Sequence, residues 1–543
     1  MAAFIIKTIA SVEKILKYTA PKMEETRGVC FENARYNFQL ATWSEERLRG
    51  CKVEVEGTLA PFVRLRIAED VAVKFTYNFD IHGDDDFVLG QKAGLYPDLL
   101  REYESFDLSY FPDQWTSIWV TVTGGEKPLP AGEHTLTFTV KNESGELAKT
   151  QYTLTVIAEK LPPLDLFNTN WVHYDCIAEW YRMEVFSKEY YPVMNAYLKN
   201  ALDHGVNTLL TPLFTPPLDT KVGEERLTVQ LVGVERKNGK YTFDFTQLDE
   251  FLNNAFSLGF ERIEFSHLFT QWGGLYCPKI MATTERGYEK IFGWETESEG
   301  EEYVAFLNAF LPALMRYVEE KGIFEQCYLH LTDEPQKKDL EKYSALRRIV
   351  KAHAKGMPVI DALSEYEFVE HVDIPVVDIS CVKHFVGKCE AFGAYYFCGT
   401  SKNAANRFIV HPALRTRLLG YQAYRHKFTG FLHWGFNFWK TEHSVKNIDP
   451  YLVNDAGGAF PAGDPFTVYP GENAPVDSVR NEIVSDGWQD YRELLFVERR
   501  VGREAILRLF DKYKLFTIND YSLEEQDYVA LRKEILSLAG IEV

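Results

Sequence analysis

The chain is 543 residues long, which is more than one ordinary domain needs, so we expect two or three domains. Hydrophobic residues make up 46% of the sequence and aromatic residues 14%, enough for large cores and too much for a disordered chain. The formal net charge of -20, from 59 basic and 79 acidic residues, argues against nucleic acid and anionic membranes as partners.

The N-terminus and the cysteines bear on where the protein works. The first residues lack the basic region that precedes the apolar part of a secretory signal, and Lys7 interrupts that apolar part. No later stretch is long and apolar enough to span a bilayer. The eight cysteines are scattered and form no C-x-x-C pair, so neither a zinc site nor a disulfide framework is indicated. We predict a cytoplasmic protein with reduced thiols.

The first third of the chain has the pattern of a β-sandwich. Short stretches that alternate between apolar and polar residues, such as Lys52–Glu56 and His134–Val140, are separated by turn sequences such as Gly124-Gly125. The sequence Leu161–Leu164 contains two prolines and forms a stiff linker. The expected parts are an N-terminal segment over 1–29, a sandwich domain over 30–160 and a second domain with C-terminal helices over 165–543.

Beyond Asp165 the pattern changes to strands that alternate with amphipathic helices. Eight such units fit a TIM barrel, a closed (β/α)8 fold, with loop insertions. A doubly wound sheet is less suitable, because no G-x-G-x-x-G or G-x-x-x-x-G-K-[ST] motif accompanies the first strand. The expected strands are Phe167–His173, Asn207–Phe214, Arg262–Leu268, Cys327–Thr332, Pro358–Leu363, Val376–Cys381, Ala394–Cys398 and Gly430–Phe438. The clearest helices are Tyr190–His204, Glu301–Lys321, Lys338–His353 and Ala413–His426.

The most informative stretch is Cys327–Pro335, in which an apolar strand ends in two adjacent acids, Asp333 and Glu334. Pro335 forbids continuation of the strand. Two like charges this close, at the end of a core strand, raise at least one pKa. A protonated acid beside an ionised one is what cleavage of a glycosidic bond requires, and the carboxyl ends of barrel strands carry the chemistry. The alternative is structural: either acid would cap the following helix, with Pro335 in its first turn.

Other expected strand ends carry aromatic, amide, imidazole and carboxylate groups, which suit a sugar. Aromatic rings stack on its C–H faces, and polar groups form hydrogen bonds with its hydroxyls. Each residue also has a structural alternative, since a tryptophan can fill the barrel, a histidine can be a satisfied core residue and an aspartate can cap a turn. Their clustering at several strand ends favours binding. The candidates for substrate binding are His173, Asp219, His267, Trp272, Tyr395, Tyr396, Trp434, Asn437 and Trp439.

Trp434 and Trp439 are expected to be mostly buried, with at least one lining the sugar site at the top of the barrel. His173, Asp175 and His267 are the nearest approach to a metal site, but no short ligand spacing supports one. We therefore expect neither a metal nor a cofactor.

The order of several motifs resembles glycoside hydrolase family 123 and its relatives. The resemblance spans nearly the whole chain, and it implies a sandwich followed by a barrel, a glycan substrate and the activity of an exo-acting β-N-acetylgalactosaminidase. The motifs are Tyr96-Pro97-Asp98, Thr215–Thr220, Thr332–Pro335, Trp434–Trp439, Gly463–Gly471, Ser478-Val479-Arg480 and Asp486–Tyr491.

The resemblance also implies a retaining, substrate-assisted mechanism, in which the 2-acetamido oxygen of the substrate attacks the anomeric carbon. Asp333 would orient the acetamido group, and Glu334 would protonate the leaving oxygen and then activate water. Asp464, within one of the shared motifs, joins the expected substrate-binding residues. Two other functions stay open: hydrolysis of a different glycoside on the same scaffold, and glycan binding without catalysis. The presence of both acids with aromatic strand ends counts against the second.

Overall fold

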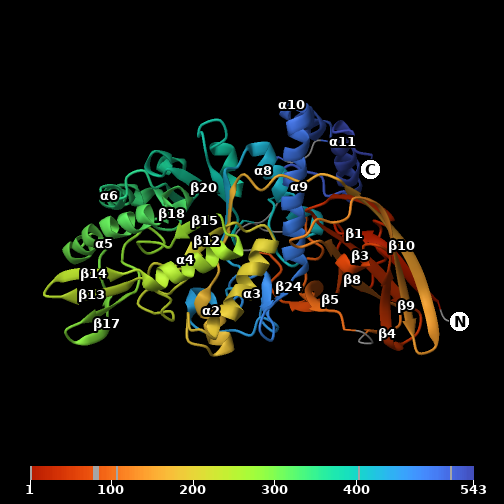
Figure 1. The fold of residues 1–543 in the computed structure, drawn as a ribbon, viewed down its shortest axis with the longest axis horizontal. Helices are drawn as coiled ribbons and strands as arrows, with labels where there is room; N and C mark the ends of the chain where they lie inside the picture. The colour runs from red at the N-terminus through yellow and green to blue at the C-terminus, as the bar shows by residue number, and fades with distance from the viewer. Residues whose placement is uncertain (1–2, 78–84, 105–107, 401–403, 514–516, 543) are drawn as a thin grey trace.

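The structure, a computed structural model, describes residues 3–77, 85–104, 108–400, 404–513 and 517–542. A part built from β-strands, at the N-terminal end of the chain, lies beside a larger part in which strands and helices alternate (Figure 1). The long helix α9 (Val479–Val501) runs between the two parts. The chain is thus a multidomain protein with one β part and one α/β part.

The N-terminal part contains two five-stranded sheets whose buried faces meet. Phe38 of one sheet stacks on Tyr152 of the other, with ring centroids 4.0 Å apart. The described part of the segment 1–29, which was expected to be separate, contains the first strand and the start of the second, so it belongs to the sheets. One sheet has the order β1 (Phe4–Ala10), β3 (Arg35–Ser44), β8 (Gln114–Thr123), β5 (Val63–Val73) and β6 (Gly94–Glu102). The other has the order β2 (Arg27–Phe31), β10 (Gly145–Ile157), β9 (Gly132–Asn142), β4 (Leu48–Glu56) and β7 (Leu108–Tyr110).

The second part contains a closed barrel of eight parallel strands, which confirms the barrel predicted from the sequence. Each strand lies at an expected position, and most are shorter than expected because the chain turns away soon after the carboxyl end of each strand. In order they are β11 (Phe167–Asn170), β12 (Thr208–Thr211), β15 (Arg262–Phe265), β18 (Cys327–His330), β19 (Val359–Leu363), β20 (Ile374–Asp378), β21 (Gly393–Tyr395) and β22 (Gly430–His433).

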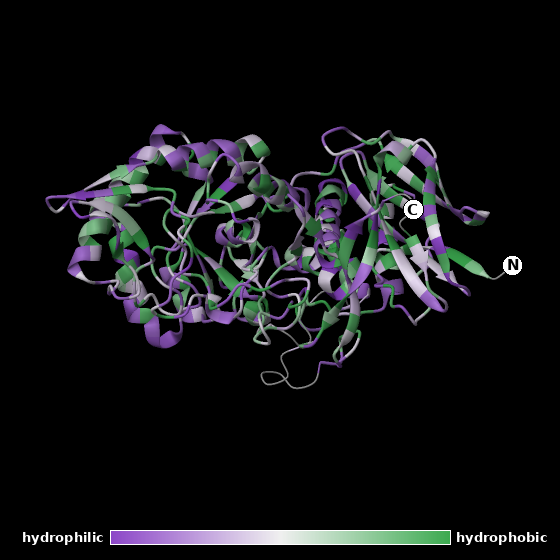
Figure 2. Cartoon of the chain, turned by 90° about the horizontal axis from the view of Figure 1, so that it is seen from below, coloured by the Kyte–Doolittle hydropathy of each residue, from purple (hydrophilic) through white to green (hydrophobic). Residues whose placement is uncertain are grey.

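Helices cover the outside of the barrel, with their hydrophilic residues facing outward (Figure 2). In α5 (Glu301–Glu320), Tyr303, Phe306 and Phe310 recur at helical spacing and are fully buried, while two acids occupy the first turn, where the helix dipole favours them. The other barrel helices are α2 (Tyr174–Tyr181), α3 (Tyr190–Asp203), α4 (Thr246–Leu258), α6 (Leu340–Lys351), α7 (Ala413–Arg417) and α8 (Leu419–His426). The chain ends with α10 (Arg503–Lys512) and α11 (Glu525–Leu538).

The barrel departs from regular alternation in two places. Only 3-10 turns, Tyr366–His371 and Ile379–His384, follow β19 and β20 within the fully described stretch 359–395. These connections are short, so they leave little room for a helix. A four-stranded sheet that was not expected projects from the loops after β12 and β15. Its strands are β14 (Lys240–Asp244), β13 (Gly233–Lys237), β16 (Ile280–Thr284) and β17 (Gly287–Phe292).

Buried ion pairs hold α9 against the N-terminal sheets. Arg480 donates from Nε and Nη2 to the two carboxylate oxygens of Asp98, at 2.7 and 2.9 Å. Two arginines of the sheet, Arg35 and Arg66, pair with Glu482, two residues further along the helix. Removing such groups from water is costly unless each charge is compensated, so these pairs fix how the two parts fit together.

Two further expectations concern localisation and redox state. None of the described helices is long and apolar enough to cross a membrane. All eight cysteines lie in the described ranges, five of them are buried, and none forms a disulfide. The cytoplasmic location remains a prediction.

The pair between Asp98 and Arg480 predicts a large, position-specific loss of stability. In an Asp98→Asn variant, Arg480 keeps a buried charge without a counter-charge, which costs about 3–5 kcal/mol. Urea unfolding of this part of the protein measures the loss. Glu133→Gln is the control, because its pair with Arg27 has side chains 61% and 70% exposed, and such pairs contribute less than about 1 kcal/mol. Equal losses in the two variants would contradict the assignment.

Candidate active site

A cavity of about 190 Å³ opens at the carboxyl ends of the barrel strands. It is mostly apolar, with carboxylates from several loops pointing into it. Its lining residues are Trp171, Leu218, Asp219, Gln271, Trp272, Asp333, Glu334, Ala362, Tyr395, Phe397, Cys398, Leu432, Trp434, Glu442, His443 and Phe460.

The two adjacent acids lie where β18 ends. The peptide N–H of Trp272 donates to the carbonyl of Asp333 (2.8 Å), and the N–H of Glu334 donates to the carbonyl of Ala362 in β19 (3.0 Å). The next helical turn begins after Gln336, which forms a capping box with Asp339. Neither acid is therefore the cap of that helix, and the structural alternative for the pair is wrong.

Burial raises the pKa of both acids. For Asp333 the neighbouring Glu334 carboxylate raises the pKa further, whereas His330 opposes the shift. For Glu334 the burial is opposed by Tyr395, whose hydroxyl donates to Oε1 at 2.7 Å. The pair consequently retains a proton to higher pH than free carboxylic acids do.

Beneath Asp333, a histidine lies between two buried carboxylates. His330 is fully buried, with Nδ1 2.9 Å from Glu264 and Nε2 2.9 Å from Asp361. Burial alone would lower the pKa of His330, but Asp361 and Glu264 raise it to about 10, so the ring is an imidazolium at neutral pH. We call Glu264, His330 and Asp361 the buried triad.

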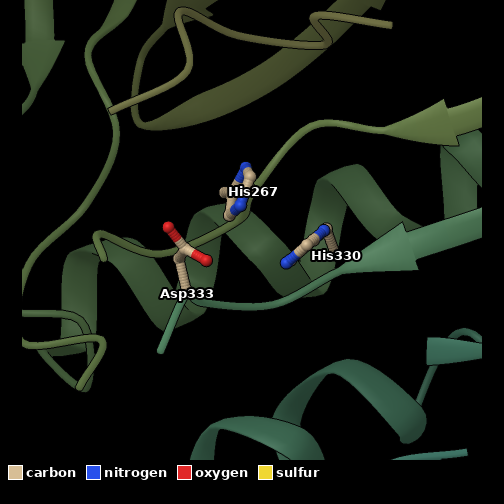
Figure 3. Close-up of side chains that lie close together, drawn as sticks. All are labelled: His267, His330 and Asp333. Atoms are coloured by element: carbon tan, nitrogen blue, oxygen red, sulfur yellow. The ribbon is translucent and has the colours of Figure 1, made fainter. Parts of the chain in front are cut away.

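The ring of His267 packs against His330, with centroids 3.9 Å apart, and both face Asp333 (Figure 3). A nitrogen from each ring and a carboxylate oxygen of Asp333 lie within 4.8 Å of one another. Burial lowers the pKa of His267 well below its usual value, so this ring is neutral. His330 has both nitrogens engaged by carboxylates and no lone pair to offer, so the cluster is poorly suited to hold a metal ion.

Of the ten residues predicted to bind substrate, four line the cavity and six lie behind it, where they support its wall. The four that line it beside the two acids are Asp219, Trp272, Tyr395 and Trp434, and Trp272 lies at the mouth with 40% of its surface exposed. Those that do not line it are His173, His267, Tyr396, Asn437, Trp439 and Asp464.

Asp464 and Trp439 are two of the six residues behind the cavity. Asp464 accepts a hydrogen bond from the indole N–H of Trp434 (3.0 Å), and burial raises the pKa of Asp464 to about 7. Trp439 packs on Trp180 and donates to the carbonyl of Val468, outside the cavity. Only one of the two tryptophans of this segment, Trp434, therefore lines the site.

His173 also supports the wall. Its Nε2 lies 2.8 Å from the carbonyl of Trp434, its Nδ1 lies 3.0 Å from Arg226, and its backbone is bound on both sides by the Asn437 amide. Burial, with Arg226 nearby, lowers the pKa of His173 to about 3, so the ring is neutral. Asp175, once considered with His173 as a metal ligand, is instead paired with Arg226 through both oxygens.

Two loops meet at Asp219 on the rim of the cavity. Asp219 accepts from the N–H of His443 (3.0 Å), and its own N–H donates to Gln271 (2.7 Å). Burial raises the pKa of Asp219 to about 6, although His443 opposes the shift. The sequence analysis missed His443, along with Glu442 and Phe460, because these residues lie in loops beyond the last barrel strand and match no motif.

Backbone strain also gathers at the cavity. Eleven non-glycine residues of the described chain have positive φ, and four of them line this one cavity: Asp219, Trp272, Glu334 and His443. Such conformations cost about 1–3 kcal/mol each and persist where the surrounding structure holds them, which is common at functional sites. The strain therefore points to the same place as the acid pair.

Comparisons with known proteins show the family of the chain. The sequence model for "Glycoside hydrolase 123, catalytic domain" matches residues 171–497, more than half of the chain. The chain belongs to glycoside hydrolase family 123. It is accordingly a glycosidase, and its substrate is a glycan. No curated protein matches the sequence.

Solved structures include one with a similar fold along the whole chain. A family 123 glycoside hydrolase from Clostridium perfringens has 14% identity, a TM-score of 0.75, and coverage of 99% of this chain and 98% of its own. At that identity the similarity shows the fold alone. A family 39 glycoside hydrolase from Bacteroides cellulosilyticus WH2 has 11% identity, a TM-score of 0.34, and coverage of 86% of this chain and 81% of its own. The latter similarity is too low to carry an argument.

The bond from Tyr395 to Glu334 predicts a shift in the pH dependence of this family 123 enzyme. In Tyr395→Phe the Glu334 carboxylate loses a donor, so the pKa of Glu334 should rise by about 1 unit. Activity that needs a protonated Glu334 is lost as pH rises through that pKa, and the alkaline limb of kcat/KM should move to higher pH.

Tyr396→Phe is the matched control. The Tyr396 hydroxyl is buried and has no hydrogen-bond partner within the described residues, and Tyr396 does not line the cavity. The alkaline limb should stay in place in this variant. An alkaline limb that is unmoved in Tyr395→Phe would contradict the assigned role of the bond.

Proposed function

We propose that the protein is an exo-acting, retaining glycoside hydrolase that removes terminal β-linked N-acetylgalactosamine by substrate-assisted catalysis. The observation that carries the proposal is the adjacency of Asp333 and Glu334 at one strand end inside one cavity.

The adjacency favours a nucleophile that belongs to the substrate. A retaining enzyme with a carboxylate nucleophile places its two acids about 5–5.5 Å apart, on opposite sides of the scissile bond. Asp333 and Glu334 are neighbours in the chain and leave one strand end, so they are poorly placed to flank a sugar ring in that way. A 2-acetamido oxygen that attacks the anomeric carbon removes the difficulty.

The proposed reaction has two steps. In the first, Glu334 gives its proton to the glycosidic oxygen, the bond from that oxygen to the anomeric carbon breaks, and the acetamido oxygen bonds to the anomeric carbon. Asp333, as a carboxylate, accepts a hydrogen bond from the acetamido N–H and stabilises the positive charge that develops there. In the second step, Glu334 takes a proton from water, the water oxygen bonds to the anomeric carbon, and the acetamido oxygen leaves. Two inversions give retention.

The walls of the cavity suit a single terminal sugar. Trp171, Tyr395 and Trp434 offer aromatic surface for its C–H faces, and Asp219 and Glu442 offer acceptors for its hydroxyls. The similar structure from Clostridium perfringens is described as that of an enzyme of glycolipid glycan hydrolysis. That description supports a glycan of the glycolipid kind as the substrate, and the 2-acetamido group rests on the adjacency of the two acids.

A panel of aryl β-glycosides tests the proposed substrate. The panel pairs each sugar that carries a 2-acetamido group with the same sugar that carries a 2-hydroxyl group. We expect cleavage of the acetamido members, most rapidly of N-acetylgalactosamine, with retention seen by NMR of the first-formed product. Cleavage of the hydroxyl members alone would assign the scaffold to a different glycoside. Sugar binding without any cleavage would indicate a glycan-binding protein.

Glu334→Gln should keep the fold and bind sugar, because the change is nearly isosteric, but should lose general acid function. Loss of a positioned acid costs about 10²–10⁴-fold in rate. The loss should be smaller for an aryl glycoside with a good leaving group, because that substrate needs little protonation. Glu442→Gln is an equally isosteric change at a carboxylate assigned to sugar binding, and any loss of activity in that variant should not depend on the leaving group. Activity of Glu334→Gln within a few-fold of wild type on an unactivated glycoside would remove Glu334 from the mechanism.

Asp333→Asn should cripple turnover of acetamido substrates while Glu334 continues to titrate. An N-acetyl thiazoline that mimics the cyclised intermediate should inhibit the wild type far more strongly than the parent sugar does, because species that resemble the transition state bind more tightly than substrate. Inhibition constants and pH profiles measure both effects. A covalent adduct on Asp333, trapped with an activated fluorosugar that lacks the acetamido group, would replace the proposed mechanism by one with a carboxylate nucleophile.

A further inference from the structure

The inner end of the cavity rests on the buried triad. Each of its carboxylates bonds an element of the cavity wall in addition to His330. Glu264 accepts from the indole N–H of Trp171 at 3.1 Å, and Asp361 accepts from the backbone N–H of Thr332 at 3.1 Å. His330 thereby joins the aromatic floor of the cavity to the residue that precedes Asp333.

The triad also places a positive charge close to Asp333. A ring nitrogen of His330, a ring nitrogen of His267 and a carboxylate oxygen of Asp333 all lie within 4.8 Å of one another (Figure 3). The charged and titratable groups that face Asp333 are Glu334 in its own segment, His330 in β18, His267 and Glu264 from β15 and the loop after it, and Asp361 from β19.

Only one of these groups is a cation. Three of them, Glu334, Glu264 and Asp361, raise the pKa of Asp333 and so disfavour its negative charge. The ring of His267 is neutral. A carboxylate that must act as an acceptor in this setting needs a compensating positive charge within a few ångströms. His330 is the group that supplies it.

We propose that His330 is a positioning residue, whose imidazolium charge holds Asp333 ionised and oriented toward the acetamido group of the substrate. The inference rests on the proposed function, since it assigns Asp333 the role of acceptor for the acetamido N–H. Burial and Glu334 raise the pKa of Asp333 well above its usual value, and His330 acts in the opposite direction, which is the effect that the inference assigns to it.

The effect of the His330 charge is measured in a variant that lacks one of the two acids of the buried triad. Replacing His330 alone would leave two buried carboxylates without a counter-charge, and that loss would itself disturb the site. Asp361→Asn removes one carboxylate and keeps Glu264 beside His330, and Glu264 continues to raise the pKa of that ring. The double variant Asp361→Asn, His330→Gln then differs from the single variant by the imidazolium charge, and its two amides can bond each other.

The acid limb of kcat/KM on an acetamido glycoside reports the ionisation of Asp333. Activity that needs the Asp333 carboxylate is present above its pKa and is lost as pH falls through it. Asp361→Asn removes a nearby negative charge, so its acid limb should move to lower pH than in the wild type. The double variant loses the cation, so its acid limb should lie about 1–3 pH units above that of the single variant. The pH dependence of thiazoline binding gives the same comparison without turnover.

Tyr343→Phe is the control, because the Tyr343 hydroxyl donates to Asp361 (3.0 Å) and carries no charge at working pH. Its acid limb should coincide with that of the wild type. Acid limbs at the same pH in the single and double variants would overturn the inference. If the double variant fails to fold, the single variant decides: an acid limb of Asp361→Asn that does not move to lower pH than that of the wild type would overturn the inference. A wild type that cleaves no acetamido glycoside would instead overturn the proposed function, and the panel of substrates reveals that outcome before any variant is made.

Discussion

The site depends on holding two adjacent, half-buried carboxylates in one cavity without leaving their charge uncompensated. Barrel interiors are usually filled by branched aliphatic side chains. Here the layer beneath the acids contains the Glu264–His330–Asp361 triad, in which an imidazolium lies between two carboxylates. Buried ion pairs of this kind add little net stability, so their presence is better explained by the charge that they provide to the site than by the strength of the fold.

A compensated buried charge also connects the N-terminal sheets to the cavity. Arg480 of α9 bonds Asp98 of β6, and its Nη1 donates to the carbonyls of Gly463 and Phe466. Asp464 lies between Gly463 and Phe466 in the sequence, and it accepts a hydrogen bond from the indole N–H of Trp434, which lines the cavity. An ion pair at the boundary between the two parts thus holds a loop that positions a cavity wall. The sheets are therefore part of the support of the site, although none of their residues lines the cavity.

The sequence predicted the barrel because strands buried on both faces appear as apolar runs. It predicted the acid pair because two carboxylates after such a run are unusual. It missed Glu264, a single acid inside an expected strand, since nothing in the sequence shows that His330 compensates its charge. His173 was expected to contact the sugar, but residue type alone does not distinguish a ring that lines a cavity from one that supports it. The rim at His443 depends on loops that are far apart in the sequence and carry no local pattern.

One strand end can serve two roles because the two acids are anchored to different neighbours of β18. The carbonyl of Asp333 is bound from the side of β15 by Trp272, while the N–H of Glu334 is bound from β19 by Ala362. The positive φ of Glu334 breaks the regular alternation of the strand at this residue, and its carboxylate meets Tyr395 of β21. Asp333 faces the histidines after β15 and in β18. The chain thus directs consecutive residues to opposite sides of β18, and the strain at Glu334 follows from that separation.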